Sequence, residues 1–201
     1  MLDKEIRKQR ESIIAKQHNG IYPVYEVFYI RSIIYAADRS EAAFQRFEIA
    51  ATKADLATLT FATLQEALTH AGALSRFFWP VKKSLLTDTR GNRLREAFGL
   101  DDNSPLVCRN LRNKFEHFDE HLDSFLLQDL AGTFLPDPLV DTLNTSDTVL
   151  DNTFKLVDPE EGVCVLLGEK FEFQSIRSEV QRILSCALEM EKQGGRLKRY
   201  R

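Results

Sequence analysis

The chain has 201 residues, of which 43% are apolar, and it carries a net charge of −3. This length and composition suffice for one buried core, and they exclude collagen-like, low-complexity and broadly disordered proteins. No run of about 18 apolar residues occurs and the first residues lack an apolar segment, so neither a transmembrane helix nor a signal peptide is expected. The cysteines Cys108, Cys164 and Cys186 are far apart, which predicts no disulfide framework and favours a cytoplasmic protein.

Helical periodicity covers the first half of the chain. Residues 2–18 predict a charged helix that stops at the Asn-Gly pair of residues 19–20, because both residue types readily adopt the left-handed conformation. Pro23 suits the first turn of the next helix. Ser40 is a candidate N-cap, so we expect an interruption there. A long apolar pattern then predicts helix over residues 41–79.

The middle of the chain is expected to stay helical. Residues 92–98 predict a short helix that ends at Gly99. Ser104 followed by Pro105 is a helix start signal, with serine as the N-cap and proline at the first helical position. The helix that begins there should run to about residue 130. A loop of roughly 15 residues, opened by two prolines, follows it.

The period of the pattern changes near the carboxyl end. Residues 154–157 and 163–167 are two apolar runs joined by Asp-Pro-Glu-Glu-Gly, which predicts a β-hairpin. Residues 170–173 alternate in polarity and can add a third short strand. Residues 175–193 predict an amphipathic closing helix, which a Gly-Gly pair ends.

These patterns together predict a mainly α-helical protein that forms a single domain over residues 1–201. We expect residues 24–130 to form a helical bundle and residues 150–173 to form a small β-hairpin appendage. Residues 175–193 are the closing helix, and residues 194–201 are a basic tail.

Basic residues concentrate in one segment. Residues 76–95 contain a single acid, Asp88, and the following lysines and arginines: Arg76, Lys82, Lys83, Arg90, Arg93 and Arg95. Such a patch can meet phosphates, although runs of charge are more often solvated faces.

The expected helix at residues 104–130 combines an apolar stripe with a dense set of polar residues. At about 100° per residue, Asn113, His117 and His121 fall on one side of the stripe, together with Asn110. Arg112 lies about 140° from His117 on the same helical wheel. Polar side chains at this density suggest that the helix carries a functional site.

Residues 112–117, Arg-Asn-Lys-Phe-Glu-His, resemble the Arg-polar-x3-His signature of the HEPN superfamily. The segment at residues 74–80, which ends a long helix, is also similar to bacterial members. The resemblance covers residues 24–130. It implies an α-helical fold, a homodimer and, in many members, endoribonuclease activity that needs no metal and no cofactor. Such proteins often act as toxins or defence components, so an antitoxin or another partner protein is also implied.

The resemblance implies a role for each residue of the motif. His117 would transfer protons, since histidine titrates near neutral pH. Arg112 would stabilise the charged transition state, because its guanidinium matches phosphate and stays charged. Asn113 would orient the imidazole or a phosphate oxygen. The homodimer would bring two motifs together in one composite site, and the expected substrate contacts are Arg109, Arg76 and His121.

Three other readings of these residues remain open. A HEPN-like module without catalysis could bind a nucleotide or a protein. Residues 117–121 also fit His-x-x-Glu-His, an inverted zinc motif with Glu120 as the base, whose third ligand would come from the closing helix. The candidate third ligands are Glu179, Glu189 and Glu191. Finally, the charged residues could simply form ion pairs along a solvated helix face.

Overall fold

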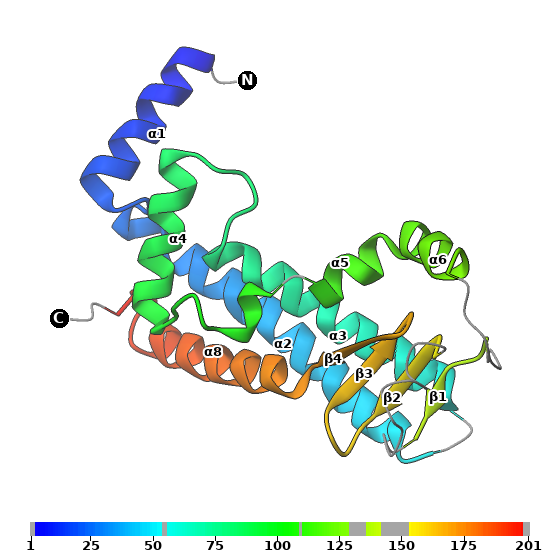
Figure 1. Cartoon of the computed structure of the whole chain (residues 1–201). Helices are drawn as coiled ribbons and strands as arrows, with labels where there is room; N and C mark the ends of the chain where they lie inside the picture. The colour runs from blue at the N-terminus through cyan, green and yellow to red at the C-terminus, as the bar shows by residue number, and fades with distance from the viewer. Residues whose placement is uncertain (1–2, 54–55, 109, 129–135, 142–152, 199–201) are drawn as a thin grey trace.

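Two long antiparallel helices, α2 (Glu26–Ala51) and α3 (Ala57–Phe78), lie side by side and form the centre of the molecule (Figure 1). The computed structural model describes residues 3–53, 56–108, 110–128, 136–141 and 153–198. Helix α8 (Gln174–Lys192) packs against α2, which places the closing helix on the central pair. The mainly α-helical fold predicted from the sequence, with a small sheet and a closing helix, is confirmed.

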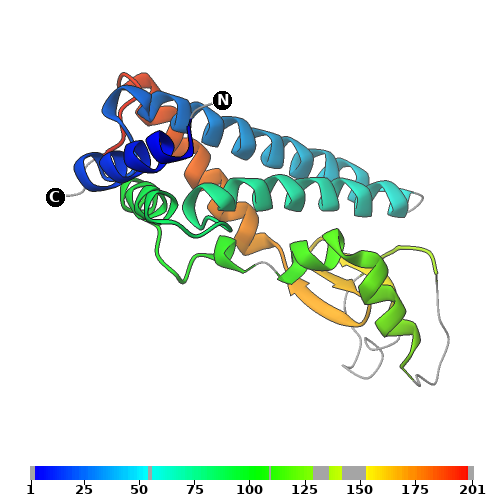
Figure 2. The same cartoon turned by 90° about the horizontal axis from the view of Figure 1, so that it is seen from above.

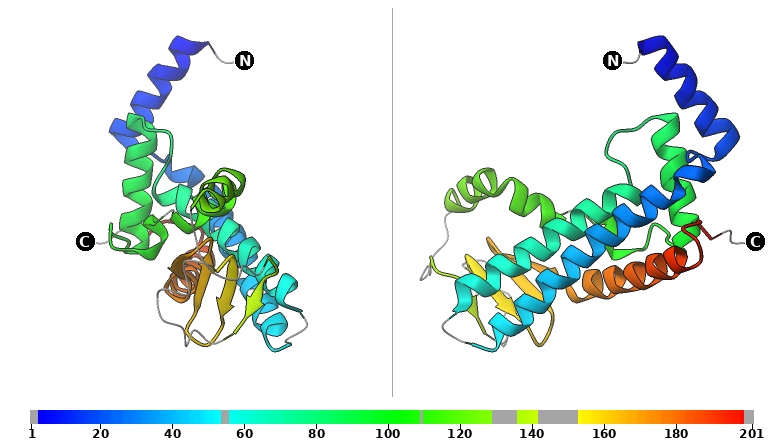
Figure 3. Two further views of the ribbon diagram at one scale, coloured as in Figure 1. Left: turned by 45° about the vertical axis from the view of Figure 1, so that its right-hand side comes forward. Right: turned by 180° about the vertical axis from the view of Figure 1, so that it is seen from behind.

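Other elements gather at the two ends of this pair. Helices α1 (Lys4–His18) and α4 (Leu85–Phe98) lie together at one end, near both chain termini. A four-stranded sheet and the short helices α5 (Asn110–Glu116) and α6 (Phe118–Leu126) lie at the other end (Figures 2 and 3). Within the described part of the chain, no helix combines the length and apolarity needed to cross a membrane.

Helix α1 begins and ends where the sequence predicts. The Asp3 carboxylate accepts a hydrogen bond from the Glu5 amide, and Asn19 takes the left-handed conformation with φ 48°. Gly20 follows with φ 80°, and a Cβ atom there would lie 2.3 Å from the Arg90 backbone nitrogen. Glycine therefore lets the end of α1 pack directly on α4.

The expected interruption at Ser40 is wrong, because α2 continues through it without a break. The helix expected over residues 41–79 is instead divided, since α2 ends at Ala51 and α3 begins at Ala57. Ser40 is fully buried, and its hydroxyl donates to the Ala67 carbonyl of α3 at 2.8 Å. The serine thus joins two helices instead of capping one. Alanines at the same seam, Ala37, Ala43 and Ala71, let the helices approach closely.

Helix α4 starts seven residues earlier than the expected residue 92, and it ends at Gly99 as predicted. Its first turn is fixed by a capping box in which Ser84 and Thr87 each bond the other's backbone N–H. Weak periodicity around Asp88 hides this start in the sequence. A capping box satisfies two otherwise free N–H groups and explains why the helix begins there.

The single helix expected over residues 104–130 is wrong, since the structure divides the segment into three pieces. Ser104 and Pro105 do start a helical turn, but it is the 3-10 helix η3 (Pro105–Val107), after which Cys108 is extended. Helices α5 and α6 follow and meet at His117. Leu106 packs in the core around α4 and α8, whereas Leu111 packs in the core around the sheet. The chain must bend because these two cores lie apart.

The predicted hairpin is present as β2 (Lys155–Asp158) and β3 (Val163–Leu166), and β4 (Glu169–Glu172) adds the third strand. The Asp158 carboxylate accepts from the Glu160 and Glu161 amides and so fixes the turn. A fourth strand, β1 (Leu139–Val140), pairs in parallel with β2. It lies where a loop was expected, and the remainder of that loop is outside the described residues.

Two hydrophobic clusters span the molecule. One joins α2, α3, α4 and α8, and it includes Val180, Ile183 and Met190 of the closing helix. The other joins the far half of the α2–α3 pair to the sheet and to α5 and α6. The strands therefore share a buried core with the central helices and hold α5 and α6 in place.

Candidate functional site

His117 is the residue at which α5 ends and α6 begins. Its N–H donates to the Asn113 carbonyl at 2.9 Å, and its own carbonyl accepts from the His121 N–H at 3.2 Å. Its backbone angles, φ −116° and ψ 40°, do not continue a helix. The side chain is 58% exposed, and its Nδ1 lies 3.8 Å from a Glu120 carboxylate oxygen. The break thus presents an accessible imidazole beside the first turn of α6.

The structure brings Arg76 to this break. A terminal nitrogen of Arg76, near the end of α3, lies 3.2 Å from a carboxylate oxygen of Glu116, the residue before His117. Asn113 is exposed one turn before His117, and His121 is half-buried one turn after it. Three predicted site residues, Asn113, His117 and His121, therefore lie within about two turns of chain, and Arg76 of α3 pairs with a neighbour of His117.

The two other predicted arginines are placed less fully. Arg112 belongs to α5, and its side chain is outside the described part of the structure. Arg109 lies outside the described residues altogether. The angle predicted between Arg112 and His117 assumes a straight helix, and α5 ends at Glu116. Beyond the break at His117, His121 therefore no longer lies on one continuous helix face with Asn113.

Aromatic rings anchor the chain on both sides of His117. Phe115 packs edge-on against Phe61 of α3, with ring centroids 5.7 Å apart, and Phe118 packs against Phe154 at 5.9 Å. The Lys155 ammonium of β2 lies 4.6 Å from the centre of the Phe118 ring. It lies 4.8 Å from the centre of the Phe154 ring and 5.5 Å from that of Phe61. Burial lowers the pKa of Lys155, and the ring faces offset part of its lost hydration.

A second lysine holds α5 itself. Lys114 is 8% exposed and forms an ion pair with Glu169 of β4. The sequence indicates no role for Lys114 or Lys155, because each is a lone lysine whose partners come from distant segments. Together the aromatic rings and this ion pair fix the orientation of the helix break.

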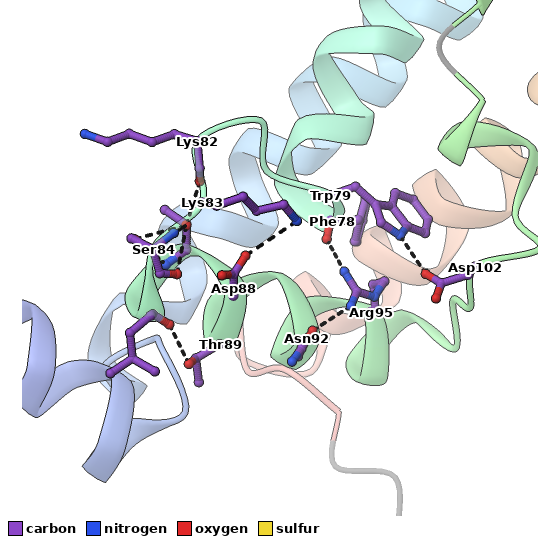
Figure 4. Close-up of polar contacts among 12 residues, drawn as sticks. Phe78, Trp79, Lys82, Lys83, Ser84, Asp88, Thr89, Asn92, Arg95 and Asp102 are labelled. Atoms are coloured by element: carbon purple, nitrogen blue, oxygen red, sulfur yellow. Dashed lines mark hydrogen bonds and ion pairs between the residues drawn. The ribbon is translucent and has the colours of Figure 1, made fainter.

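The basic segment at residues 76–95 divides into two sets of side chains. Arg95 donates to the Phe78 carbonyl at 2.7 Å and lies 5.7 Å from the Trp79 ring, while Lys83 pairs with Asp88 at 3.6 Å (Figure 4). Arg93 is buried beside Glu26, at 3.7 Å. Arg93 and Arg95 are thus used inside the fold, whereas Lys83 is 73% exposed in a surface ion pair.

The other set comprises Arg76, Lys82 and Arg90, which line a cavity of about 360 Å³ between α3 and α4. Lys82 extends away from the protein in Figure 4. Thr87 supplies a hydroxyl to the same cavity. Only half of the basic patch seen in the sequence is therefore placed to meet an anion.

The hypothesis of a zinc site at residues 117–121 gains no support from the structure. In the described part of the chain, no three His, Cys, Asp or Glu side chains are grouped so that they could hold a metal ion. Glu179 accepts from the Ser104 hydroxyl and pairs with Arg182, which lowers the pKa of its carboxyl against the effect of burial. Glu191 pairs with Arg31 at 3.1 Å. Glu189 accepts from the Gln193 side-chain amide at 2.5 Å, so all three candidate third ligands are engaged elsewhere.

Comparisons with protein-family models, with curated proteins and with solved structures find no match to this chain. The site is therefore defined by its own chemistry. It offers an exposed imidazole at a helix break, an exposed amide one turn earlier and an arginine–carboxylate pair beside it. Such a group can transfer protons at neutral pH, and the neighbouring arginine can meet phosphate.

Proposed function

We propose that this protein is a metal-independent endoribonuclease of the HEPN type, with a composite site formed by two copies of the α5–α6 segment. The observation that supports this most is the break at His117, which leaves the imidazole 58% exposed next to the Arg76–Glu116 pair. A histidine that only filled the core would be buried. A histidine on a solvated helix face would not need neighbouring residues packed into the core on both sides of it, as Phe115 and Phe118 are.

The residues suit cleavage of RNA by its own 2′-hydroxyl. His117 takes the 2′-hydroxyl proton while that oxygen attacks the adjacent phosphorus, and a protonated imidazole returns a proton to the leaving 5′-oxygen. The products are a 2′,3′-cyclic phosphate and a free 5′-hydroxyl. Arg112 stabilises the negative charge that develops on the phosphorane, and Asn113 orients the imidazole or a phosphate oxygen. One His117 serves first as the base and then, protonated, as the acid, and the Arg112 beside it comes from the partner chain.

A second copy also has a surface to pack against. Leu126 and Leu127, at the end of α6, are 65% and 86% exposed. These two side chains would add apolar area to a contact between copies of this segment. A two-fold axis beside α5 and α6 would bring both His117 imidazoles and both Arg112 side chains to one place.

The proposal is tested by RNA cleavage in the presence of EDTA. We expect the wild type to cleave single-stranded RNA with cyclic-phosphate ends. The variants Arg112→Ala and His117→Ala should each lose about 100-fold or more of the rate, because a general acid–base group and a transition-state cation each contribute that much. Arg46→Ala, which removes an exposed arginine paired with Glu66, is the matched control and should keep full activity.

Two results would overturn the assignment. Full activity in folded, dimeric His117→Ala would remove the proposed acid–base group. Loss of wild-type activity in EDTA would replace the metal-free mechanism with a metal-dependent one. Circular dichroism and the molar mass in solution show whether each variant is folded and dimeric.

A HEPN-like module without catalysis is the second candidate. It is favoured by the carboxylates that surround His117, since Glu120 lies 3.8 Å from the imidazole and Asp119 and Asp123 are exposed on α6. Carboxylates repel RNA and suit a protein contact. Absence of cleavage by wild-type protein on varied RNAs, together with an intact dimer, would support this module.

A further inference from the structure

Three cavities adjoin on the face formed by α1, α2, α3 and α4, at the end of the molecule away from the sheet. Their volumes are about 670, 440 and 360 Å³, and Phe77 lines all three. Phe28 and Ser32 are shared by the first two, and Ala73 is shared by the last two. They therefore form one continuous concave surface, which we call the aromatic–basic groove.

Aromatic rings line this groove to an unusual extent: Tyr22, Tyr25, Phe28, Tyr29, Tyr35 and Phe77. Phe28 is 64% exposed and Tyr35 is 67% exposed. Rings of Tyr22, Tyr25 and Phe28 follow one another with centroids 5.9 and 6.0 Å apart. Each ring contacts the next edge-on, and the part of each ring that stays in solvent can accept a base.

The charge of the groove is opposite to that of the chain. The described residues that line the three cavities include no aspartate or glutamate, and the cations among them are Arg10, Arg31, Arg76, Lys82 and Arg90. Arg31 pairs with Glu191 and Arg76 with Glu116, outside this lining. By contrast, the cavity between α2 and the sheet is lined by three acids, Glu48, Asp141 and Glu160, and by one cation, Arg177. In a protein of net charge −3, this separation concentrates positive potential in the groove.

Arg90 has one polar atom without a partner at this face. Its Nε is buried and has no hydrogen-bond partner among the described residues, and its guanidinium lies 5.8 Å from the Tyr29 ring centre. Arg10 and Lys82 also have no carboxylate partner within the part of the chain that the structure describes. An anionic ligand in the groove would pair with Arg10 and Lys82, beside the Arg90 guanidinium.

We propose that the aromatic–basic groove binds single-stranded RNA, with bases stacked on Phe28 and Phe77 and phosphates held by Lys82 and Arg90. Sequence-tolerant binding of single strands uses this combination of exposed rings and a positively charged groove. The inference rests on the proposed function and identifies the surface along which the RNA substrate would bind. Arg76 lines the groove and pairs with Glu116, so RNA lying in the groove would lead toward His117.

A second copy of the chain is a less suitable occupant. A two-fold interface presents the same surface from both copies. The cations of one groove would then face the cations of the other without carboxylates between them, and like charges brought together oppose association. RNA instead supplies phosphates for the cations of the groove and flat bases for its exposed rings.

The test is fluorescence anisotropy with a labelled oligouridine of twelve nucleotides, measured at several salt concentrations. The His117→Ala protein serves as the background, so that binding is measured without cleavage. We expect Phe28→Ala to weaken binding about fivefold or more, as the loss of one base–ring stack does. Lys82→Ala should lower the slope of log K against log salt by about 0.7, the value for one phosphate contact on a single strand.

Two controls match these variants. Ile49→Ala removes an apolar side chain of α2 that is 66% exposed and lies outside the groove, and Lys53→Ala removes an exposed lysine from the α2–α3 turn. Affinity and salt slope equal to these controls in both groove variants would overturn the proposal. A Phe28→Ala protein that changes from dimer to monomer with unchanged RNA affinity would also overturn it and identify the groove as a contact between copies.

These results are separable from those of the cleavage test. Binding that depends on the groove, with no cleavage by the wild type, supports the groove and removes the nuclease assignment. Cleavage that needs His117, with groove variants that bind normally, supports the nuclease and removes the groove.

Discussion

Arg95 and Lys82 come from the same basic stretch of sequence, and their surroundings give them different roles. Arg95 donates a 2.7 Å hydrogen bond to the carbonyl of Phe78, the last residue of α3, and its guanidinium lies 5.7 Å from the Trp79 ring. A cation at the carboxyl end of a helix is stabilised by the helix dipole. Lys82 lies between α3 and α4, and its side chain extends away from the protein (Figure 4).

We expect Arg95→Met to lower the free energy of unfolding by about 2 kcal/mol, because the Phe78 carbonyl loses a charged donor and Trp79 loses its cation. Lys82→Met should change the same quantity by less than about 0.5 kcal/mol, as surface substitutions usually do. Urea unfolding followed by tryptophan fluorescence measures both. Equal stability of the two variants would contradict the structural role assigned to Arg95.

At the scale of elements, α8 is tied to α2 through one arginine. Arg177 lies 3.2 Å from Glu41, also pairs with Glu48, and lies 5.5 Å from the ring of Phe44. The Arg177 side chain and Glu41 are both largely buried, at 12% and 13% exposure, whereas Glu48 is 56% exposed. The hydrogen bond from Arg177 lowers the pKa of the Glu48 carboxyl.

Arg177→Met should destabilise the protein by about 2 kcal/mol at neutral pH, because Glu41 keeps a buried charge without its partner. A lowered pKa in the folded state means that Glu48 adds stability above its ordinary value near 4.5 and loses this as pH falls through the folded value. The difference between wild type and variant should therefore shrink from pH 7 to pH 3. Urea unfolding at both pH values measures it, and a constant difference would contradict the linkage.

The α5–α6 segment shows what elements decide for the candidate site. Sequence signals at Ser104 and Pro105 act locally, and they produce a helical turn where predicted. The continuation of that helix depends on where Leu106 and Leu111 are buried, and they belong to different clusters. Caps could therefore be read from the sequence, whereas the break that exposes His117 could not.

At the scale of the whole molecule, the proposed site is completed only by a second chain. One copy presents its α5 and α6 at the end of the α2–α3 pair, away from the termini and from α1 and α4 (Figure 3). If each composite site takes its arginine from one chain and its histidine from the other, two different inactive variants can complement each other in a mixed dimer.

Mixing Arg112→Ala with His117→Ala after subunit exchange should restore about a quarter of wild-type activity. Half of the dimers are then mixed, and each mixed dimer has one intact and one doubly altered site. The cleavage rate of the exchanged mixture, compared with each variant alone, measures this. Activity no greater than that of the separate variants would show that both residues act within one chain or that both copies of each are required.

The sequence by itself determined the features that depend on neighbouring residues. The end of α1 at Asn19, the end of α4 at Gly99, the hairpin of β2 and β3 and the amphipathic α8 all follow from caps, turns and periodicity. Such signals act over a few residues and depend little on tertiary context, although burial between two helices overrode the cap signal at Ser40. They are enough to predict a mainly α-helical protein with a small sheet.

Only the tertiary structure decided which charged and aromatic side chains are free for function. The basic segment reads as one patch, yet Arg93 and Arg95 are used inside the fold, while Lys82 and Arg90 line the groove. The groove itself joins side chains of α1, α2, α3 and α4. Their proximity depends on helix packing between segments far apart in the chain, and no local pattern in the sequence records such contacts.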